Sequence, residues 1–544
     1  MASFDYVIIG GGSAGCILAA ELSADPSNRV LLLEAGDPVD RNPETLDAEG
    51  YKDTFVNPRL LFDRHSTAQV GCKGRSIFVG TGRGLGGSGS VNAMVYLRGS
   101  RADFDGWGVP GWGWDDVRPA FEAIEEVLDV HRRAPTDFTE TAIYAAEQAG
   151  MRRGEDLNDG DLLGRLGYEW MNYAGDRRRS SYVAFLAPHL LRTNLVVETG
   201  ARARRLIFNE GRASGVEYQL GSGTIHRVKA GREVILCAGA LETPRLLLLS
   251  GIGPAAALDR HGLPVVHDLP GVGEGLRDHP NVTLFFRGDR EVDCHYPQLY
   301  GFDQVGRGIG LAREQADTCF VFYPARSSLR EAMIRLLPAM VLPPRLRDGR
   351  VTPALLRGGV KAAFRSARVR RFVAQVYGIT VILGRPQSRG SVRLASADPL
   401  APALVDPGYL TDSEDLETMV GGVEYARRIA GAEPLRRWGN RELMPGRGCR
   451  SQRSIRAFIR KNAMTTYHFA SSCRMGSDGG AVVDERLRVR GVRGLRIADA
   501  SVMPEIPVSA LNAPSMMIAY RAAGFVREER AAALEGGAAA PESA

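Results

Sequence analysis

The sequence lacks any apolar run of about eighteen residues, so it predicts no membrane-spanning helix. Residues 1–5 also lack the basic and apolar segments that open a secretory signal. Cysteine is scarce: seven scattered residues occur in 544, and this odd number without regular spacing argues against a disulfide framework. These absences predict a protein of a reducing compartment, and we expect it in the cytoplasm.

Metal-binding patterns are missing too. Neither a C-x-x-C pair nor an H-E-x-x-H pattern occurs, so we predict no metal site. The net charge is only +6, but residues 330–371 hold eleven Lys or Arg against two acids, which leaves the rest of the chain slightly acidic. One basic block in an acidic remainder is unlike the broad basic surface of a nucleic-acid-binding protein, so we expect no nucleic-acid partner.

Residues 5–35 predict a strand, a glycine turn, a helix and a second strand. The apolar run 6–9 is typical of a buried parallel strand, a helix is expected over about 14–23, and the run 30–33 predicts the second strand. This order is the start of a βαβ unit.

The glycine turn of this unit fits a dinucleotide. Gly10, Gly12 and Gly15 form a G-x-G-x-x-G pattern that follows the strand and opens the helix. Gly10 permits the tight turn, Gly12 allows backbone to approach a pyrophosphate at the helix start, and Gly15 allows close helix–strand packing. Glu34 ends the second strand, where its carboxylate can bind ribose hydroxyls and would repel the 2′-phosphate of NADP.

A second glycine-rich stretch, 80–90, does not repeat this fingerprint, because no second strand ends in an acid at the right distance. Apolar residues lie between its glycines, which favours a loop with one buried side over a flexible linker. A single dinucleotide site bearing FAD would leave no nicotinamide partner. Substrate would then reduce the flavin, and a diffusible acceptor would reoxidise it.

Two polar residues near the carboxyl end are candidates for catalysis, although each has an ordinary structural explanation. His468 lies between aromatic residues, where a histidine can simply be part of the core, but a run of small polar residues follows it and favours a ligand-binding loop. Asn512 directly precedes a predicted helix from Pro514 to about 527, where it could also serve as the N-cap.

Four ordered blocks of this sequence resemble the glucose–methanol–choline (GMC) oxidoreductases, in particular the bacterial choline and alcohol dehydrogenase-like branch. The first block joins 5–15 with Glu34-Ala35-Gly36. The others are 84–99 (GLGGSGSVNAMVYLRG), 238–253 (AGALETPRLLLLSGIG), and 468–476 with 494–519. The resemblance covers nearly the whole chain.

This resemblance implies FAD as the cofactor and a large set of residues around it. The implied and fingerprint-derived cofactor contacts are Gly10, Gly12, Ser13, Ala14, Gly15, Glu34, Ala35, Arg83, Gly87, Ser88, Val91, Asn92, Ala93, Met94, Val95, Ala203, Asp499, Ala500, Asn512, Pro514 and Met516. Some family members attach FAD covalently through a histidine of the glycine loop. Val91 stands at that position here, so the resemblance implies non-covalent FAD.

The resemblance also implies the chemistry. His468 would be the catalytic base and Asn512 its partner in the oxidation of a primary or secondary alcohol to an aldehyde or ketone, with hydride passing to flavin N5. Phe469-Ala470-Ser471-Ser472 and Ser509-Ala510-Leu511 depart from the family pattern and make one pocket wall more apolar, so we expect an apolar alcohol. Oxygen, a quinone or a carrier protein would accept the electrons.

Two other activities of related proteins stay open as alternatives, namely a hydroxynitrile-lyase-like reaction and a decarboxylase. The stretch 384–390 also resembles the fatty-acid photodecarboxylase branch. That branch, however, carries a cysteine where Gly384 stands and lacks the histidine that His468 supplies.

The basic insertion 329–375 contains two segments with helical apolar spacing, 329–337 and 360–373. Basic amphipathic helices can lie on anionic membranes, which would place the protein peripherally at the inner face of a membrane. A solvated helical face or a subunit contact explains the same pattern.

The expected fold class is α/β, with a Rossmann-like FAD-binding domain and a discontinuous, α+β substrate-binding domain built from a sheet and helices. The FAD-binding domain is expected over 1–160, 193–285 and 480–530, and the substrate-binding domain over 161–192 and 286–479. The tail 531–544 is predicted to be disordered. The flavin is expected at the junction of the two domains.

Overall fold

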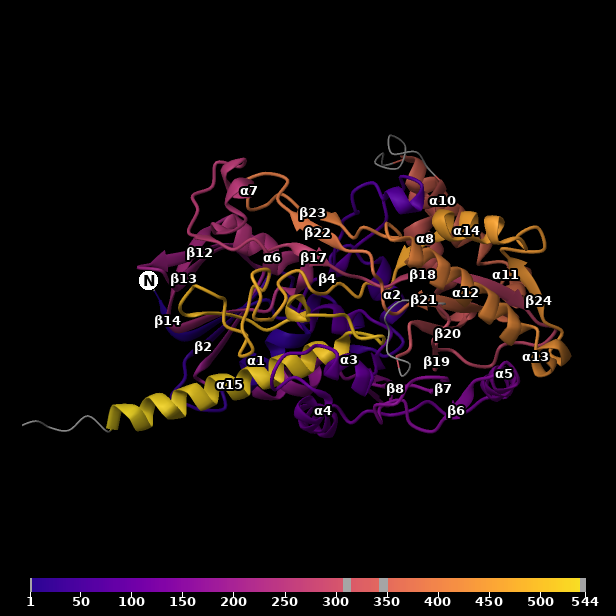
Figure 1. The fold of residues 1–544 in the computed structure, drawn as a ribbon, viewed down its shortest axis with the longest axis horizontal. Coiled ribbons are helices and arrows are strands. Elements are labelled where there is room, and N and C mark those ends of the chain that lie inside the picture. The colour runs from indigo at the N-terminus through magenta and orange to yellow at the C-terminus, as the bar shows by residue number, and fades with distance from the viewer. Residues whose placement is uncertain (1, 307–314, 342–350, 539–544) are drawn as a thin grey trace, which may run out of the picture.

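The computed structural model describes residues 2–306, 315–341 and 351–538, and it contains two large sheets that lie side by side along the molecule (Figure 1). The amino-terminal sheet and the long helix α15 occupy the left of Figure 1, and the second sheet occupies the right. This arrangement confirms the α/β fold class expected from the sequence.

The first sheet combines parallel and antiparallel strands. Its order is β11 (Leu195–Thr199), β2 (Val30–Glu34), β1 (Ser3–Ile9), β14 (Ile225–Leu236), β13 (Arg212–Leu220) and β12 (Ala201–Asn209), with β26 (Leu495–Ile497) also paired to β14. β1 runs parallel to both β2 and β14, whereas β12, β13 and β14 are antiparallel.

The centre of this sheet is buried because its strands are apolar on both faces. All five residues of β2 and the last four of β1 are buried, as the continuous apolar runs predicted. Helix α1 (Ser13–Leu22) follows β1 and packs against α15 (Asn512–Ala538). The carboxyl ends of β1, β2 and β14 therefore open at one edge, where α1 begins.

The second sheet is almost entirely antiparallel. Its order is β24 (Arg441–Met444), β18 (Pro280–Arg287), β21 (Val376–Leu383), β20 (Thr318–Pro324), β19 (Leu299–Asp303), β7 (Arg165–Tyr168) and β6 (Arg152–Gly154), and β25 (Met464–Thr465) also pairs with β18. Its central strands β19, β20 and β21 come from residues 299–324 and 376–383.

Alternation along these strands gives the second sheet two different faces. In β18, Val282, Leu284 and Phe286 belong to a core that also includes residues of helix α12 (Ser413–Ala430). The intervening Asn281 and Thr283 border a cavity instead. One face of the sheet is thus held by the core while the other is free to form a binding wall.

The other helices and the short strands of the described residues complete the fold. The remaining helices are α2 (Tyr51–Val56), α3 (Arg101–Asp105), α4 (Trp114–Leu128), α5 (Asp137–Gln148), α6 (Gly239–Leu249), α7 (Ala255–Asp259), α8 (Ala325–Val341), α10 (Val351–Ala363), α11 (Ala367–Ala374), α13 (Glu433–Arg437) and α14 (Gln452–Asn462). The short strands are β3 (Leu61–Phe62), β4 (Thr81–Gly82), β5 (Val95–Tyr96), β8 (Trp170–Met171), β9 (Tyr173–Ala174), β10 (Arg177–Arg178), β15 (Ile252–Gly253), β16 (His267–Asp268), β17 (Glu274–Leu276), β22 (Gly390–Arg393) and β23 (Leu404–Asp406).

Helix α15 corrects the prediction of a disordered tail. The helix runs to Ala538, so residues 531–538 are helical and only 539–544 lie outside the described residues. Its charged side chains are held by the first sheet and helix α1: Glu529 accepts a hydrogen bond from Arg496, and Arg527 pairs with Glu21. The alanine-rich sequence that follows favours helix once these contacts have fixed its start.

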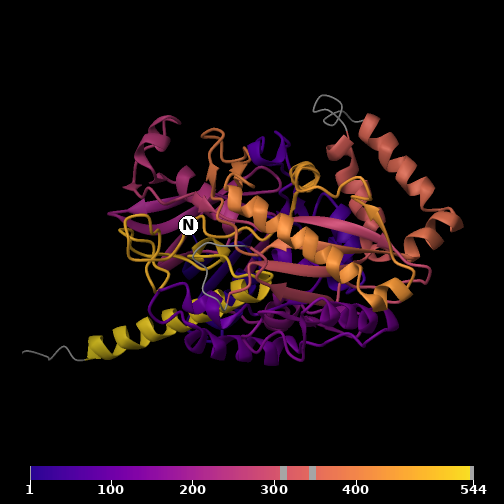
Figure 2. The ribbon, with the colours of Figure 1, turned by 45° about the vertical axis from the view of Figure 1, so that its right-hand side comes forward.

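The two segments of the basic insertion with helical apolar spacing are helical, as predicted. The segment 329–337 lies within α8, whereas 360–373 divides between α10 and α11 instead of forming one helix. In Figure 2 these three helices stand out from the upper right of the molecule.

The proposed domain boundaries stay a prediction, but two strands from segments assigned to the FAD-binding domain belong to the second sheet. β6, inside the segment 1–160, and β18, mostly inside 193–285, both belong to the second sheet. Segments near the expected boundaries therefore pass between the two sheets more than once.

Candidate active site

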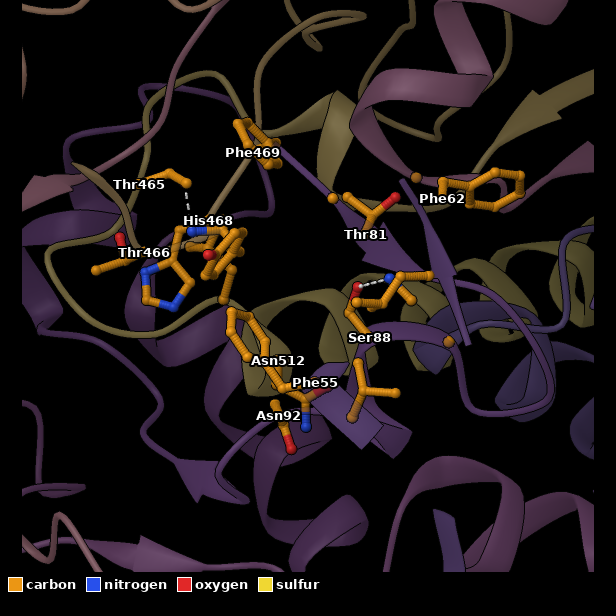
Figure 3. Close-up of a pocket in the computed structure, with 18 of the residues that line it drawn as sticks. Phe55, Phe62, Thr81, Ser88, Asn92, Thr465, Thr466, His468, Phe469 and Asn512 are labelled. Carbon is orange, nitrogen blue, oxygen red and sulfur yellow. Dashed lines mark hydrogen bonds between the residues drawn. The ribbon is translucent and has the colours of Figure 1, made fainter. Parts of the chain in front are cut away.

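A cavity of about 740 Å³ is lined by residues of both halves of the fold (Figure 3). One end is bordered by the start of α1, the end of β2 and the glycine loop after β4. The other end is bordered by the second sheet, by α8 and by the loop that carries His468. The long shape of this lining suits an extended cofactor with a substrate beyond it.

The glycine turn forms a cradle at the start of α1. Gly10 has φ of +99°, and a Cβ there would lie 2.5 Å from the carbonyl oxygen of Cys237, so only glycine fits. Gly12 is different, because a Cβ at Gly12 would meet no atom of the chain closer than 3.9 Å. No side chain caps α1, which leaves backbone N–H groups at its start for an anion.

Glu34 joins three pieces of this cradle. Its carboxylate accepts backbone N–H groups from Gly11 at 2.7 Å, Gly36 at 2.7 Å and Gly84 at 2.9 Å. Burial raises the pKa of this carboxyl, and the three hydrogen bonds oppose that rise. Beyond the predicted ribose contact, Glu34 thus holds the second glycine loop against the first.

A buried arginine that was not singled out from the sequence supports the glycine loop. Arg178 donates to Asn92 Oδ1 at 2.7 Å, to Asn92 O at 2.7 Å and to Gly89 O at 3.1 Å. The amide of Met94 donates to the same Oδ1 at 2.9 Å, with Met94 in the left-handed region at φ +66°. Because Oδ1 is occupied twice, the Asn92 side-chain NH₂ group is the part left for the cavity.

Most residues expected to contact the cofactor border this cavity. These are Gly10, Gly12, Ser13, Ala14, Glu34, Ala35, Gly87, Ser88, Val91, Asn92, Ala93, Val95, Ala203, Asp499, Ala500 and Asn512. Five others do not line it: Gly15, Arg83, Met94, Pro514 and Met516. Gly15 serves packing, since a Cβ there would lie 1.9 Å from the carbonyl oxygen of Gly10, and Arg83 donates to Ala35 O.

Asn512 borders the cavity at the start of α15. Its Oδ1 accepts the hydroxyl of Ser13 at 2.8 Å, so this oxygen is used between two helix starts instead of capping α15. The side-chain Nδ2 is buried and has no partner among the described residues. Such an orphaned donor beside the cradle fits a bound acceptor group.

His468 borders the same cavity, but the structure gives it a histidine as its direct partner. His468 Nδ1 and His279 Nδ1 lie 3.0 Å apart, and the two rings are nearly perpendicular at 89°. Burial lowers the pKa of His468 to about 4 and lowers that of His279 well below its usual range. Both rings are therefore neutral near pH 7, and one donates to the other.

Asp278 fixes the loop that presents His468. Its Oδ1 accepts the backbone N–H of His468 at 2.7 Å, and its Oδ2 accepts the hydroxyl of Thr465 at 2.5 Å and that of Tyr409. Burial is the main effect on this carboxyl and raises its pKa to about 6. Tyr467, with φ of +64°, turns the chain so that the histidine borders the cavity.

The substrate end of the cavity is apolar with neutral polar groups. Alternate residues of the second sheet supply Asn281, Thr283, Phe285, Tyr300, Val321, Tyr323, Thr380 and Ile382. Helix α8 adds Leu329, Met333 and Leu336 at helical spacing. Among the lining residues that the structure describes, no carboxylate comes from this sheet or from α8.

Sequence reasoning missed Asp278, His279 and Arg178. Asp278 and His279 are adjacent titratable residues just before a strand, and this pair could have marked them as candidates. No comparable signal marked Arg178, because it is one of three consecutive arginines and only burial separates it from the other two.

Comparisons with known proteins agree with this arrangement. The amino-terminal family model of the GMC oxidoreductases matches residues 4–281, and the carboxy-terminal model matches residues 386–519. The chain belongs to the GMC oxidoreductase family.

The chain is similar over nearly its whole length to several described proteins. It is 35% identical to an alcohol dehydrogenase [acceptor] of Pseudomonas putida, over 96% of this chain and 95% of that protein. It is 34% identical to the mitochondrial choline dehydrogenase of Homo sapiens, over 97% and 90%. The crystal structure of pyridoxine 4-oxidase from Mesorbium loti superimposes with a TM-score of 0.80 at 28% identity, over 96% and 99%.

These findings confirm the expected family and the FAD cofactor. The protein is an FAD-dependent oxidoreductase that acts on CH–OH donors of the alcohol or choline type. The cradle at Gly12 and the orphaned donor of Asn512 fit such a cofactor on geometry alone. In the described residues, no group of acidic, His or Cys side chains could hold a metal ion, and none of the helices is long and apolar enough to span a membrane.

The cradle predicts the effect of a single methyl group. We expect Gly12→Ala to fold with a melting temperature within about 2 °C of the parent apoprotein, because its Cβ meets no protein atom. FAD affinity should fall at least about tenfold, because the methyl occupies the approach to the pyrophosphate. Gly524→Ala, in open space on α15, is the control. Full FAD affinity in Gly12→Ala, measured by fluorescence titration, would contradict this placement.

Proposed function

We propose that the enzyme oxidises a neutral, mainly apolar primary or secondary alcohol to an aldehyde or ketone, with His468 as the base. The observation that carries this proposal is the position of the His468 imidazole, paired with His279 at the edge of the cavity. Asn512 borders the same cavity from the cofactor side. A base and a hydrogen-bond donor thus lie around the space where the two halves of the fold meet.

We assign the protons of the two histidines from the groups that surround His279. The backbone groups of Gly384 and Pro507 near the buried ring of His279 raise its pKa, so they act on it as acceptors, although its Nε2 makes no hydrogen bond among the described residues. These acceptors favour the proton on Nε2 of His279, which makes its Nδ1 the acceptor. His468 then donates from Nδ1 and keeps the lone pair on Nε2 free to take a proton from the substrate hydroxyl.

In this proposal Asn512 acts as a hydrogen-bond donor beside the base. Its Oδ1 is committed to Ser13, so its NH₂ group is the end free to donate. Such a donor stabilises negative charge on the substrate oxygen as the proton leaves, and it cannot compete as a base. When bound, FAD supplies the hydride acceptor, at N5 in this proposal, and it returns electrons to oxygen, a quinone or a carrier protein.

The wall of the substrate end selects against a cationic substrate. A quaternary ammonium would find no carboxylate among the described residues of the second sheet and α8 that line the cavity. Phe78, one of the aromatic residues there, already faces a guanidinium, since Arg335 Cζ lies 4.5 Å from its ring centroid. A second cation near this ring would meet like-charge repulsion, so a neutral alcohol fits better than choline.

The photodecarboxylase alternative is weakened by packing at Gly384. A Cβ at this position would lie 2.4 Å from Cγ2 of Val508, so the chain has no room for the cysteine of that branch without rearrangement. The proposed function uses His468, which that branch lacks.

A hydroxynitrile-lyase-like reaction would leave the flavin oxidised, and anaerobic bleaching of the flavin by an alcohol distinguishes it from oxidation.

The role of His468 predicts a large kinetic effect. His468→Ala should lower the rate of anaerobic flavin reduction by about 10²–10⁴-fold, because the hydroxyl proton has no acceptor. Stopped-flow absorbance measures this rate, and flavin content measured after gel filtration should be unchanged. Near-normal flavin reduction in the variant would remove the assignment of the base.

The histidine pair predicts both a pH profile and a rescue. Because burial lowers the pKa of His468 to about 4, the base stays neutral and the reduction rate should hold constant from pH 8 to about pH 7. Protonation of the Asp278 carboxyl, whose pKa burial raises to about 6, should then weaken its hold on the His468 loop and lower the rate. Protonation of His468 itself should stop reduction near pH 4. His279→Leu should reduce the rate by about 10–100-fold, because His468 Nδ1 loses its acceptor. His279→Gln, whose amide oxygen can accept, should recover most of it. Equal losses in both variants would indicate a packing role only.

The neutral wall predicts the order of substrates. An anaerobic screen should show faster flavin reduction by medium-chain primary alcohols than by choline, because the substrate end buries apolar surface and its described residues from the second sheet and α8 offer no carboxylate as counter-ion. Introducing a carboxylate with Thr380→Glu should improve the apparent affinity for choline relative to the alcohol, with Thr380→Gln as the neutral control. Preference for choline in the parent enzyme would overturn the proposed substrate class.

A further inference from the structure

The helices α10 and α11 present a basic surface without acidic residues. Between Val351 and Ala374 the chain carries six basic residues and no Asp or Glu. All six are exposed: Arg357, Lys361, Arg365, Arg368, Arg370 and Arg371. We call these six side chains, together with Leu355 and Phe372, the basic face. These six cations equal the net charge of the whole chain, +6, so the charges of all the other residues balance.

The basic face also exposes apolar side chains. Leu355 is 70% exposed and Phe372 is 43% exposed, each close in sequence to the cations. Single exposed apolar residues are ordinary on protein surfaces, but their combination with an unbroken set of cations is typical of surfaces that lie on anionic lipid. A polyanion such as nucleic acid would use the charges and leave these two side chains in water.

The basic face lies on helices that pack against α8, and α8 forms one wall of the substrate end of the cavity. Both α10 and α11 contact α8, and Leu329, Met333 and Leu336 of α8 line the substrate end of the cavity. Figure 2 shows the three helices projecting together from the body of the molecule. A surface that engaged the basic face would therefore lie next to the apolar end of the cavity.

We propose that the basic face docks on the surface of an anionic lipid bilayer. The cations provide electrostatic attraction to acidic headgroups, and Leu355 and Phe372 enter the interfacial region. Docking in this way is peripheral, in keeping with the absence of a spanning helix from the described residues. Docking brings the apolar cavity wall formed by α8 near the bilayer, where lipophilic alcohols and quinones concentrate.

This surface interaction can be tested apart from the proposed function. The holoenzyme is sedimented with sucrose-loaded vesicles of phosphatidylcholine, with or without about 30% phosphatidylglycerol, at low ionic strength. We expect binding to the anionic vesicles only, and loss of binding at about 0.5 M NaCl, where charges are screened within a few ångströms.

A charge-reversal variant locates the interaction. Each basic residue near an anionic surface strengthens binding about fivefold, so Arg357→Glu/Arg365→Glu/Arg368→Glu should weaken partitioning by at least about 100-fold. The matched control Arg205→Glu/Lys229→Glu/Arg260→Glu reverses three exposed charges on β12, β14 and after α7, and should bind like the parent. Flavin reduction by a water-soluble short-chain alcohol should be the same in all three proteins, which separates this test from that of the catalytic site.

Four outcomes would overturn the proposal. The protein could remain in the supernatant with anionic vesicles at low salt, or it could bind neutral and anionic vesicles equally. It could also lose binding to the same extent in the control variant, which would indicate attraction by net charge instead of the basic face. A competing interaction with double-stranded DNA that is stronger than vesicle binding at equal salt would assign the surface to a nucleic acid.

Discussion

The three hydrogen bonds to the Glu34 carboxylate hold the cofactor end of this enzyme together. They connect the first glycine turn through Gly11, the end of β2 through Gly36, and the second glycine loop through Gly84. These segments are otherwise glycine-rich backbone with little side-chain surface to pack. The three amide donors replace the hydration that the buried carboxylate loses, and these hydrogen bonds fix the shape of the cradle.

The second half of the site depends on a comparable buried carboxylate. Asp278 receives the backbone N–H of His468 and the hydroxyls of Thr465 and Tyr409, and so places His468 in contact with His279. The low pKa of the histidine pair follows from the same burial that fixes the loop. Packing and base strength are therefore two results of one arrangement, in which a dry environment keeps the imidazole neutral near pH 7.

Local patterns predicted what short-range physics controls. The glycine spacing after an apolar strand predicted the turn at Gly10 and the start of α1, and the spacing of insertion residues predicted helices at 329–337 and 360–373. Predictions weakened where distant contacts decide. The tail extends as helix because Arg496 and Glu21, far away in the sequence, bind residues of α15. Five predicted cofactor residues do not line the cavity, because neighbouring positions on a loop or a helix can face opposite ways.

The sequence by itself determined the cofactor class, since a G-x-G-x-x-G turn with an acid after the next strand is a local device whose parts lie within thirty-five residues. It also placed His468 and Asn512 among the candidates. Only the tertiary structure decided their partners, because His279 and Ser13 approach them from other elements of the fold, 189 and 499 residues away. The neutral wall of the substrate end likewise arises from alternate residues of four strands, a pattern that exists only once the strands are paired.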